Sequence, residues 1–289
     1  MKRFALFCAL GVVIACGGSG VGWEKFLLSA DMVFVSDRDG NQEIYFYDHT
    51  DGSEHRLTNH AAKDFDPAIS PDGTKVLFVS ERDANQELYL VNVDGTGLTR
   101  ITNNPAPDYL PCWHPNGTLI AWVRIIGGDR IFRMNLDGSG EMQLFGEAAY
   151  DPQFSRDGTR LAYVSGVTRD LYTCKPDGTD VKRLTNSPGT EYVPCWNANS
   201  SKLAYGYAKP AGGGDETIMV VNADGTGAIT LVDSLQGFDD WPCWTADGRY
   251  IVYTNAPGPT PFGTIWAVEP TNSAVHLVTN NAAMNPSVP

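Results

Sequence analysis

Short apolar runs separated by turn residues dominate the chain from about residue 31 onward. Each stretch of about 44 residues has room for four such runs, and Asp-Gly or Asn-Gly dipeptides stand between many of them. These dipeptides tolerate positive φ and are strong hairpin signals. The run at residues 76–80 lacks polar alternation, which is typical of a strand buried on both faces. The pattern predicts an all-β protein built from small antiparallel sheets.

A repeated proline marks the period of this pattern. Each copy has a proline, two residues, a small polar residue, a turn and an apolar run, and successive prolines are 44, 41, 42, 48 and 44 residues apart. The six prolines are Pro67, Pro111, Pro152, Pro194, Pro242 and Pro286. We name the four strands of a repeat A to D, exemplified by residues 67–70, 76–80, 87–92 and 100–102. A period of this length is typical of propeller architectures.

The strand count predicts how the ring closes. The first B–C–D set begins near residue 32 with no A strand before it, and the last A strand, residues 286–289, has no set after it. Pairing these two ends would complete the first blade and remove the open sheet edges. We therefore expect a six-bladed β-propeller of four-stranded antiparallel blades over residues 31–289, closed by pairing of the C-terminal strand with the first blade.

The repeat resembles that of the TolB-like β-propeller family, which is itself similar to WD repeats. The resemblance rests on Phe34-Val-Ser-Asp-Arg-Asp-Gly-Asn-Gln-Glu-Ile-Tyr45, on Arg56-Leu-Thr-Asn59 and on Pro67-Ala-Ile-Ser-Pro-Asp-Gly73, and it extends over about residues 31–289. TolB carries a separate α/β domain before its propeller, and we expect that domain to be absent here. The resemblance is specific for fold rather than function, because one scaffold hosts many activities.

The first thirty residues have the features of an export signal followed by a tether. Lys2 and Arg3 precede an apolar run over residues 4–15, which is shorter than a membrane-spanning helix requires. The run ends in Val13-Ile14-Ala15-Cys16, which resembles the lipobox of bacterial lipoproteins. The resemblance implies a signal peptide over residues 1–15, lipid attachment at Cys16 and a tether over residues 16–30. An ordinary signal peptide is the alternative. We expect a protein of the bacterial cell envelope that faces the periplasm or the cell surface.

The net charge and the absence of common catalytic motifs limit the classes of function that we expect. The chain has 34 acidic and 21 basic side chains, a net charge of −13, which argues against a nucleic-acid partner. It contains no Gly-x-Ser-x-Gly elbow, phosphate-binding glycine loop or His-Glu-x-x-His motif, so we expect neither an enzyme nor a cofactor. The segment Asp37-x-Asp39-Gly-Asn41-x-Glu43 resembles part of a calcium loop. Asp48 stands where the loop needs a bidentate Glu, so we interpret the segment as a hairpin turn and expect no metal.

The D–A and B–C connections, which share one face of the disc, are the longer and more variable ones. Variable loops on a rigid scaffold are a common location of binding sites. The residues just before each proline lead into the innermost strands, so we expect them to line the channel mouth with carboxylates and aromatic rings. The predicted partner-binding residues are Asp64, Phe65, Asp66, Asp108, Tyr109, Tyr150, Asp151, Glu191, Tyr192, Asp239, Asp240 and Trp241.

These residues suggest non-catalytic binding of a protein or peptide of the cell envelope by a monomeric propeller. The carboxylates would supply charge complementarity, and the aromatic rings would supply contact area. Membrane contact would occur through the N-terminal lipid only. A carbohydrate-binding module that stacks sugars on the rings and a polysaccharide lyase that uses the carboxylates are the alternatives. It also stays open whether the acidic residues only cap turns.

Overall fold

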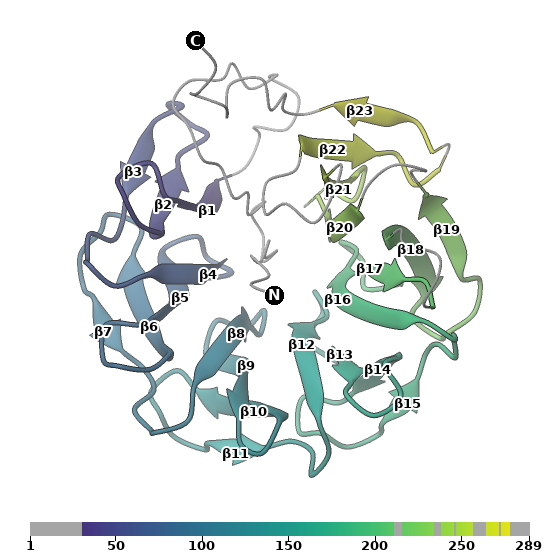
Figure 1. Ribbon diagram of the computed structural model, residues 1–289, viewed down its shortest axis with the longest axis horizontal. Coiled ribbons are helices and arrows are strands. Elements are labelled where there is room, and N and C mark those ends of the chain that lie inside the picture. Colours follow the sequence, from purple (N-terminus) through teal and green to yellow (C-terminus); the bar gives the residue numbers. More distant parts are fainter. Residues whose placement is uncertain are drawn as a thin grey trace.

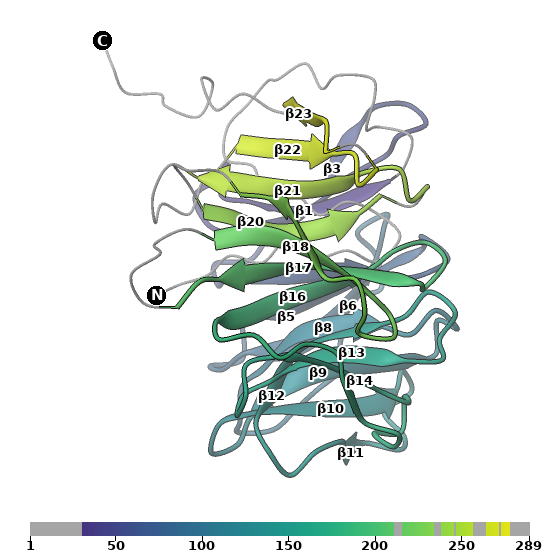
Figure 2. The same cartoon turned by 90° about the vertical axis from the view of Figure 1, so that its right-hand side faces the viewer.

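The computed structural model describes residues 31–210, 216–233, 238–245, 247–256, 264–271 and 273–277. Their strands form a ring of six blades around a central axis, and we call the region along this axis the channel (Figure 1). In the edge-on view the strands run along the axis of the ring (Figure 2). The prediction of an all-β six-bladed propeller is confirmed. Among the residues that the structure describes, no helix has the length and apolar character needed to cross a membrane.

Within each complete blade the strands follow one another from the channel outward in chain order. Blade 1 contains β1 (Met32–Ser36), β2 (Glu43–Tyr47) and β3 (Glu54–Arg56). Blade 2 contains β4 (Asp64–Ile69), β5 (Lys75–Ser80), β6 (Glu87–Asn92) and β7 (Thr99–Arg100), and blade 3 contains β8 (Asp108–Trp113), β9 (Leu119–Ile125), β10 (Asp129–Asn135) and β11 (Met142–Gln143). Blade 4 contains β12 (Ala149–Phe154), β13 (Leu161–Ser165), β14 (Leu171–Cys174) and β15 (Lys182–Arg183). Blade 5 contains β16 (Thr190–Trp196), β17 (Lys202–Ala208), β18 (Glu216–Asn222) and β19 (Ile229–Val232), and blade 6 contains β20 (Phe238–Trp244), β21 (Ile251–Ala256), β22 (Thr264–Val268) and β23 (Val275–Leu277).

Two of the predicted features lie outside the described residues. The strand expected at residues 286–289 is one of them, so the closure of blade 1 stays a prediction. The signal peptide, Cys16 and the tether, which together cover residues 1–30, are the other.

The innermost strands begin three to four residues before their prolines, so the prediction that they begin at the proline is wrong. Strand β4 starts at Asp64, and its pairing with β5 shifts register between Phe65 and Ala68. The same shift occurs in β8, β12, β16 and β20. Proline has no N–H to donate to a ladder, and a β-bulge accommodates it within a strand. The residues assigned to D–A loops from the sequence therefore belong partly to the innermost strands.

Buried tryptophans fasten neighbouring blades together at the ends of these strands. The indole nitrogen of Trp113 in blade 3 donates a 2.9 Å hydrogen bond to the carbonyl of Ala68 in blade 2. Trp196 in blade 5 donates a 3.0 Å bond to the carbonyl of Gln153 in blade 4. A buried carbonyl that loses its donor keeps its full desolvation cost. Each indole therefore stabilises the contact between two blades as well as filling space.

We expect Trp113→Phe to lower the free energy of unfolding by about 1–3 kcal/mol, because the Ala68 carbonyl loses its donor and a small cavity opens. Trp122→Phe is the matched control. Trp122 belongs to the same apolar cluster, but its indole nitrogen donates to none of the described residues. Urea unfolding of both variants checks the prediction. Equal losses would show that the inter-blade hydrogen bond contributes nothing.

Candidate functional site at the central channel

Four of the predicted mouth carboxylates are buried rather than exposed at the channel. The side chains three residues before the proline are 0–1% exposed in every blade that carries an acid there, namely Asp64, Asp108, Glu191 and Asp239. The expectation that they form a charged ring at the mouth is wrong. They belong to the innermost strands, where Asp64 pairs with Ser80 and Asp108 with Arg124 of the second strand. A buried carboxylate needs partners within the protein, and each of these four accepts at least one hydrogen bond.

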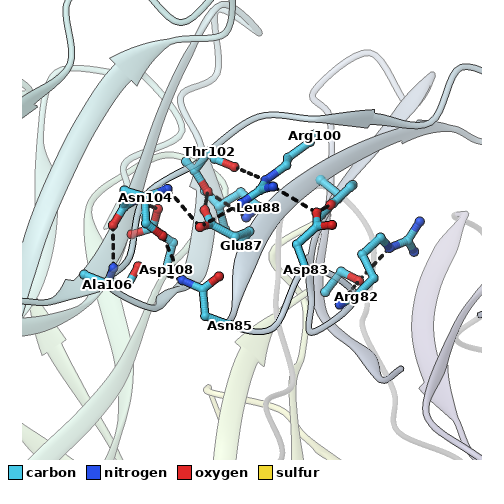
Figure 3. Close-up of polar contacts among 12 residues, drawn as sticks. Arg82, Asp83, Asn85, Glu87, Leu88, Arg100, Thr102, Asn104, Ala106 and Asp108 are labelled. Carbon is cyan, nitrogen blue, oxygen red and sulfur yellow. Dashed lines mark hydrogen bonds and ion pairs between the residues drawn. The ribbon is translucent and has the colours of Figure 1, made fainter. Parts of the chain in front are cut away.

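The compensation of Asp108 is the most complete. The Arg124 guanidinium donates to both carboxylate oxygens, over 2.7 Å from Nε to Oδ1 and 2.9 Å from Nη2 to Oδ2. Asn104 Nδ2 donates to Oδ2 over a further 2.9 Å, as Figure 3 shows. The guanidinium carbon lies 4.6 Å from the ring centre of Phe132. Asp108 therefore fixes the blade 3 hairpin and the preceding D–A loop together.

The equivalent acidic side chains in blades 2, 5 and 6 accept hydrogen bonds from different donors. Arg82 donates to Asp64 over 2.9 Å, and Asn255 donates to Asp239 over 2.8 Å. Glu191 accepts hydrogen bonds from three neutral donors, namely Ser187 Oγ at 2.8 Å, the Leu171 amide at 2.7 Å and the Thr185 hydroxyl. Burial raises the pKa of Glu191, and these hydrogen bonds oppose the rise. The acidic side chains three residues before each proline thus connect strands and loops of the propeller by hydrogen bonds.

A second buried network links the B–C hairpin to the D–A loop. Glu87 accepts hydrogen bonds from Thr102 Oγ1 at 2.6 Å and from the Asn104 amide at 2.9 Å, and it pairs with Arg100 at 3.1 Å (Figure 3). The Leu88 amide donates to Thr102 Oγ1 over 2.9 Å. This network connects the B–C hairpin of blade 2 to the D–A loop that follows Thr102.

The calcium-like segment of blade 1 takes part in the same kind of network. Glu43 is fully buried and accepts from Thr58 Oγ1 at 2.6 Å and from the His60 amide at 2.9 Å. Arg56 pairs with Glu43 and with Asp39, each at 3.1 Å. The segment therefore forms the tied hairpin turn that we interpreted it to be. The repeated Arg-x-Thr of the D strands was the sequence signal for these partners.

The residues immediately before the prolines have an unusual backbone. Their φ angles are 49°, 53°, 53°, 48° and 57° in blades 2 to 6, for Asp66, Leu110, Asp151, Val193 and Trp241 in that order. Left-handed conformation is rare for bulky or β-branched residues and persists only where the surroundings impose it. The bulge imposes it here in five successive blades. Each blade thereby contributes one bulge residue next to the central channel.

Two of these bulge residues are carboxylates that act on each other. Asp66 comes from blade 2 and Asp151 from blade 4, and the charge of Asp151 contributes to a raised pKa of Asp66. Asp66 accepts a hydrogen bond from the Leu110 amide of the next blade, and Asp151 accepts one from the Val193 amide over 2.8 Å. Burial is the main cause that raises the pKa of Asp66, to about 7. The channel therefore holds one carboxylate that titrates near neutrality.

Aromatic side chains accompany these carboxylates. Phe65, Tyr109, Tyr150 and Trp241 are half-buried and pack against the large apolar cluster, whereas Tyr192 is only 2% exposed. The Tyr109 hydroxyl donates to Asp129 Oδ1 over 2.7 Å, and burial raises its pKa. The side chain of Asp240 lies outside the described residues. Of the predicted site, the structure thus brings Asp66, Asp151 and their aromatic neighbours together, and their binding role stays a prediction.

Known proteins with this fold include binding and catalytic propellers. The TolB β-propeller domain model matches residues 29–151. TolB from Acinetobacter baumannii is 18% identical with a TM-score of 0.68, over 81% of this chain and 58% of that one. A provisionally assigned TolB from Agrobacterium tumefaciens is 18% identical with a TM-score of 0.67, over 78% and 84%. An oligogalacturonate lyase from Vibrio parahaemolyticus is 13% identical with a TM-score of 0.66, over 87% and 75%. The chain thus has the β-propeller fold of these proteins, and its residues 29–151 match the TolB β-propeller domain model.

Proposed function

We propose that this propeller is a non-catalytic binding protein whose channel takes a basic segment of a protein or peptide partner. The observation that carries the proposal is the set of half-buried rings Phe65, Tyr109, Tyr150 and Trp241, which belong to the innermost strands that also carry the bulge acids Asp66 and Asp151. A Lys or Arg side chain between them would relieve their repulsion, and the rings would pack against its aliphatic stem and its neighbours. The TolB-like fold supports this proposal, because it is shared with proteins named TolB.

The setting that we propose is the bacterial cell envelope. A lipid on Cys16 would hold the propeller at a membrane, and residues 16–30 would act as the tether. Two acyl chains or more make such an anchor stable, since each buried methylene contributes about 0.8 kcal/mol. In this setting the partner is another protein of the envelope, and the strongly acidic propeller attracts its basic segments.

Crosslinking capture from solubilised envelope tests the binding site. The bait is the double variant Asp66→Asn/Asp151→Asn, compared with the unchanged chain. Asparagine keeps an acceptor for the Leu110 and Val193 amides, so the bulges stay intact while the charge is lost. The matched control is Asp94→Asn/Asp137→Asn, because these exposed acids sit in C–D turns of the opposite face and their replacement changes the net charge equally.

We expect the unchanged chain and the control to capture the same partner and the channel variant to lose it by tenfold or more. Binding of the captured partner should also weaken steeply with salt, because it rests on charge. Capture that is equal with all three baits would contradict the channel site. Capture that is lost equally with the control and the channel variant would point to net charge alone.

A polysaccharide lyase is the second candidate. The observation in its favour is the fold that this chain shares with oligogalacturonate lyases, one of them solved in complex with manganese. Carboxylates and aromatic rings near one channel also suit a sugar acid only if a cation bridges the negative charges. Incubation with oligogalacturonates, followed by the ultraviolet absorbance of the unsaturated product, distinguishes the two. Product formation that the channel variant abolishes would replace the binding proposal.

A further inference from the structure

A cluster of two carboxylates and an imidazole lies in blade 1, where β1 begins and β2 ends, on the face opposite the D–A loops. Asp31 precedes β1, and Asp48 and His49 follow β2. Met32 pairs with Tyr47, so Asp31 and Asp48 stand opposite each other one step beyond the end of the ladder. Like charges directly opposite each other on neighbouring strands are destabilising. The sequence places this repulsion at the edge of the first described hairpin.

Other blades avoid this repulsion at the same position. In blade 2 the pair is Lys75 and Asn92, and Lys75 Nζ donates to Asn92 Oδ1 over 3.0 Å. In blade 5 it is Lys202 and Asn222. Blade 1 thus replaces a cation and an amide by two anions. Among the described residues, no lysine or arginine forms an ion pair with Asp31 or Asp48, so this pair calls for a cation of another kind.

The imidazole of His49 completes the cluster. Its Nδ1 lies 2.7 Å from Asp31 Oδ1, and one ligand atom each of Asp31, Asp48 and His49 fall within 4.8 Å of one another. The Thr50 amide and hydroxyl donate to Asp48 Oδ1 over 2.8 and 2.6 Å, which fixes the direction of that carboxylate. The three side chains are half-buried or exposed, so an ion and its water ligands have access.

We propose that Asp31, Asp48 and His49 bind a divalent transition-metal cation of the zinc class. One imidazole nitrogen with carboxylate oxygens suits zinc rather than magnesium or calcium, which prefer oxygen ligands alone. The metal replaces the hydrogen bond between His49 and Asp31 and neutralises the opposed carboxylates, and water fills the remaining positions. The metal thereby links the start of β1 to the end of β2 in the first blade.

Isothermal titration of the purified full chain with zinc chloride, after removal of metals by chelation, tests the site. We expect His49→Ala to bind one equivalent of zinc less than the unchanged chain. His55→Ala is the matched control, because this imidazole lies in the same turn region and contacts Ser53 rather than the cluster. It should retain the full stoichiometry. Equal stoichiometry in the unchanged chain and His49→Ala would overturn the proposal.

Thermal unfolding gives a second, independent readout. With chelator present, Asp48→Asn should raise the melting temperature by one to a few degrees, because it removes the like-charge pair. Zinc should raise the melting temperature of the unchanged chain and leave that of Asp48→Asn unchanged. An unchanged chain whose melting temperature does not rise with zinc would overturn the proposal.

Discussion

Replacing Asp108 with alanine is expected to lower the free energy of unfolding by about 3–5 kcal/mol, among the largest effects of any single substitution in this protein. Asp108 is 0% exposed, and the variant leaves the Arg124 guanidinium, whose side chain is 7% exposed, without its bidentate partner. A buried charge without its counterion bears the full cost of desolvation. Urea unfolding, followed by circular dichroism or tryptophan fluorescence, measures the loss.

The same arginine supplies the control. Arg124 Nη1 also pairs with Glu141 over 2.6 Å, but the Glu141 side chain is 42% exposed. We expect Glu141→Ala to cost under about 1 kcal/mol, because water screens an exposed pair and solvates the partner that remains. Similar losses in the two variants would show that burial does not set the strength of these pairs. A further check is the double variant Asp108→Leu/Arg124→Met, which should recover part of the stability.

Asp66→Asn is expected to stabilise the propeller at alkaline pH by an amount that depends on pH. The folded pKa of Asp66 is about 7 against an ordinary 3.8, because burial penalises the charged form. The folded state therefore binds the proton more tightly than the unfolded state, and its contribution to stability is complete below about pH 4. That contribution is lost as pH rises through 7. A shift of this size corresponds to about 4 kcal/mol, since one pKa unit is about 1.4 kcal/mol.

Unfolding of the unchanged chain and of Asp66→Asn at several pH values measures this difference. The two proteins should be similar near pH 4, and the variant should be the more stable one above pH 8. Asp94→Asn serves as the control with the opposite sign, because hydrogen bonds from Thr96 lower the pKa of the exposed Asp94. The stability of the unchanged chain relative to that of Asp94→Asn should rise with pH. A flat difference for Asp66→Asn would show that the channel keeps this carboxylate well solvated.

The periodic prolines and Asp-Gly turns were sufficient to predict the blade count and the strand order. They act locally, since a turn residue with positive φ sets a hairpin whatever surrounds it. The predicted starts of the innermost strands were wrong, because proline within a sheet commonly stands at the first residue of a strand, as expected for Pro67 and its equivalents. Here a bulge at Asp66 carries the strand through the proline. Such a bulge depends on pairing with a neighbouring strand, which the local sequence does not specify.

The candidate site was predicted in part. From the sequence, the position three residues before the proline and the position directly before it look equally suited to line the channel mouth, as Asp64 and Asp66 illustrate. The bulge directs the two side chains differently, so that Asp64 meets Arg82 inside the blade, whereas Asp66 accepts a hydrogen bond from the Leu110 amide of the next blade. The Arg at the end of the second strand, present as Arg82 and Arg124, was a usable signal for the buried role. The contact of Asp66 with the next blade depends on how neighbouring blades pack, which the local sequence does not specify.

The left-handed bulge has a consequence for how such a channel can diversify. The backbone conformation, rather than the side chain, determines which position of each repeat stands at the axis. The five blades whose innermost strand is described accordingly carry an acid at two of these positions and leucine, valine and tryptophan at the others without a change of architecture. The side chain at this one position can therefore differ from blade to blade. After duplication of a blade, it can change while the backbone of the innermost strand stays the same.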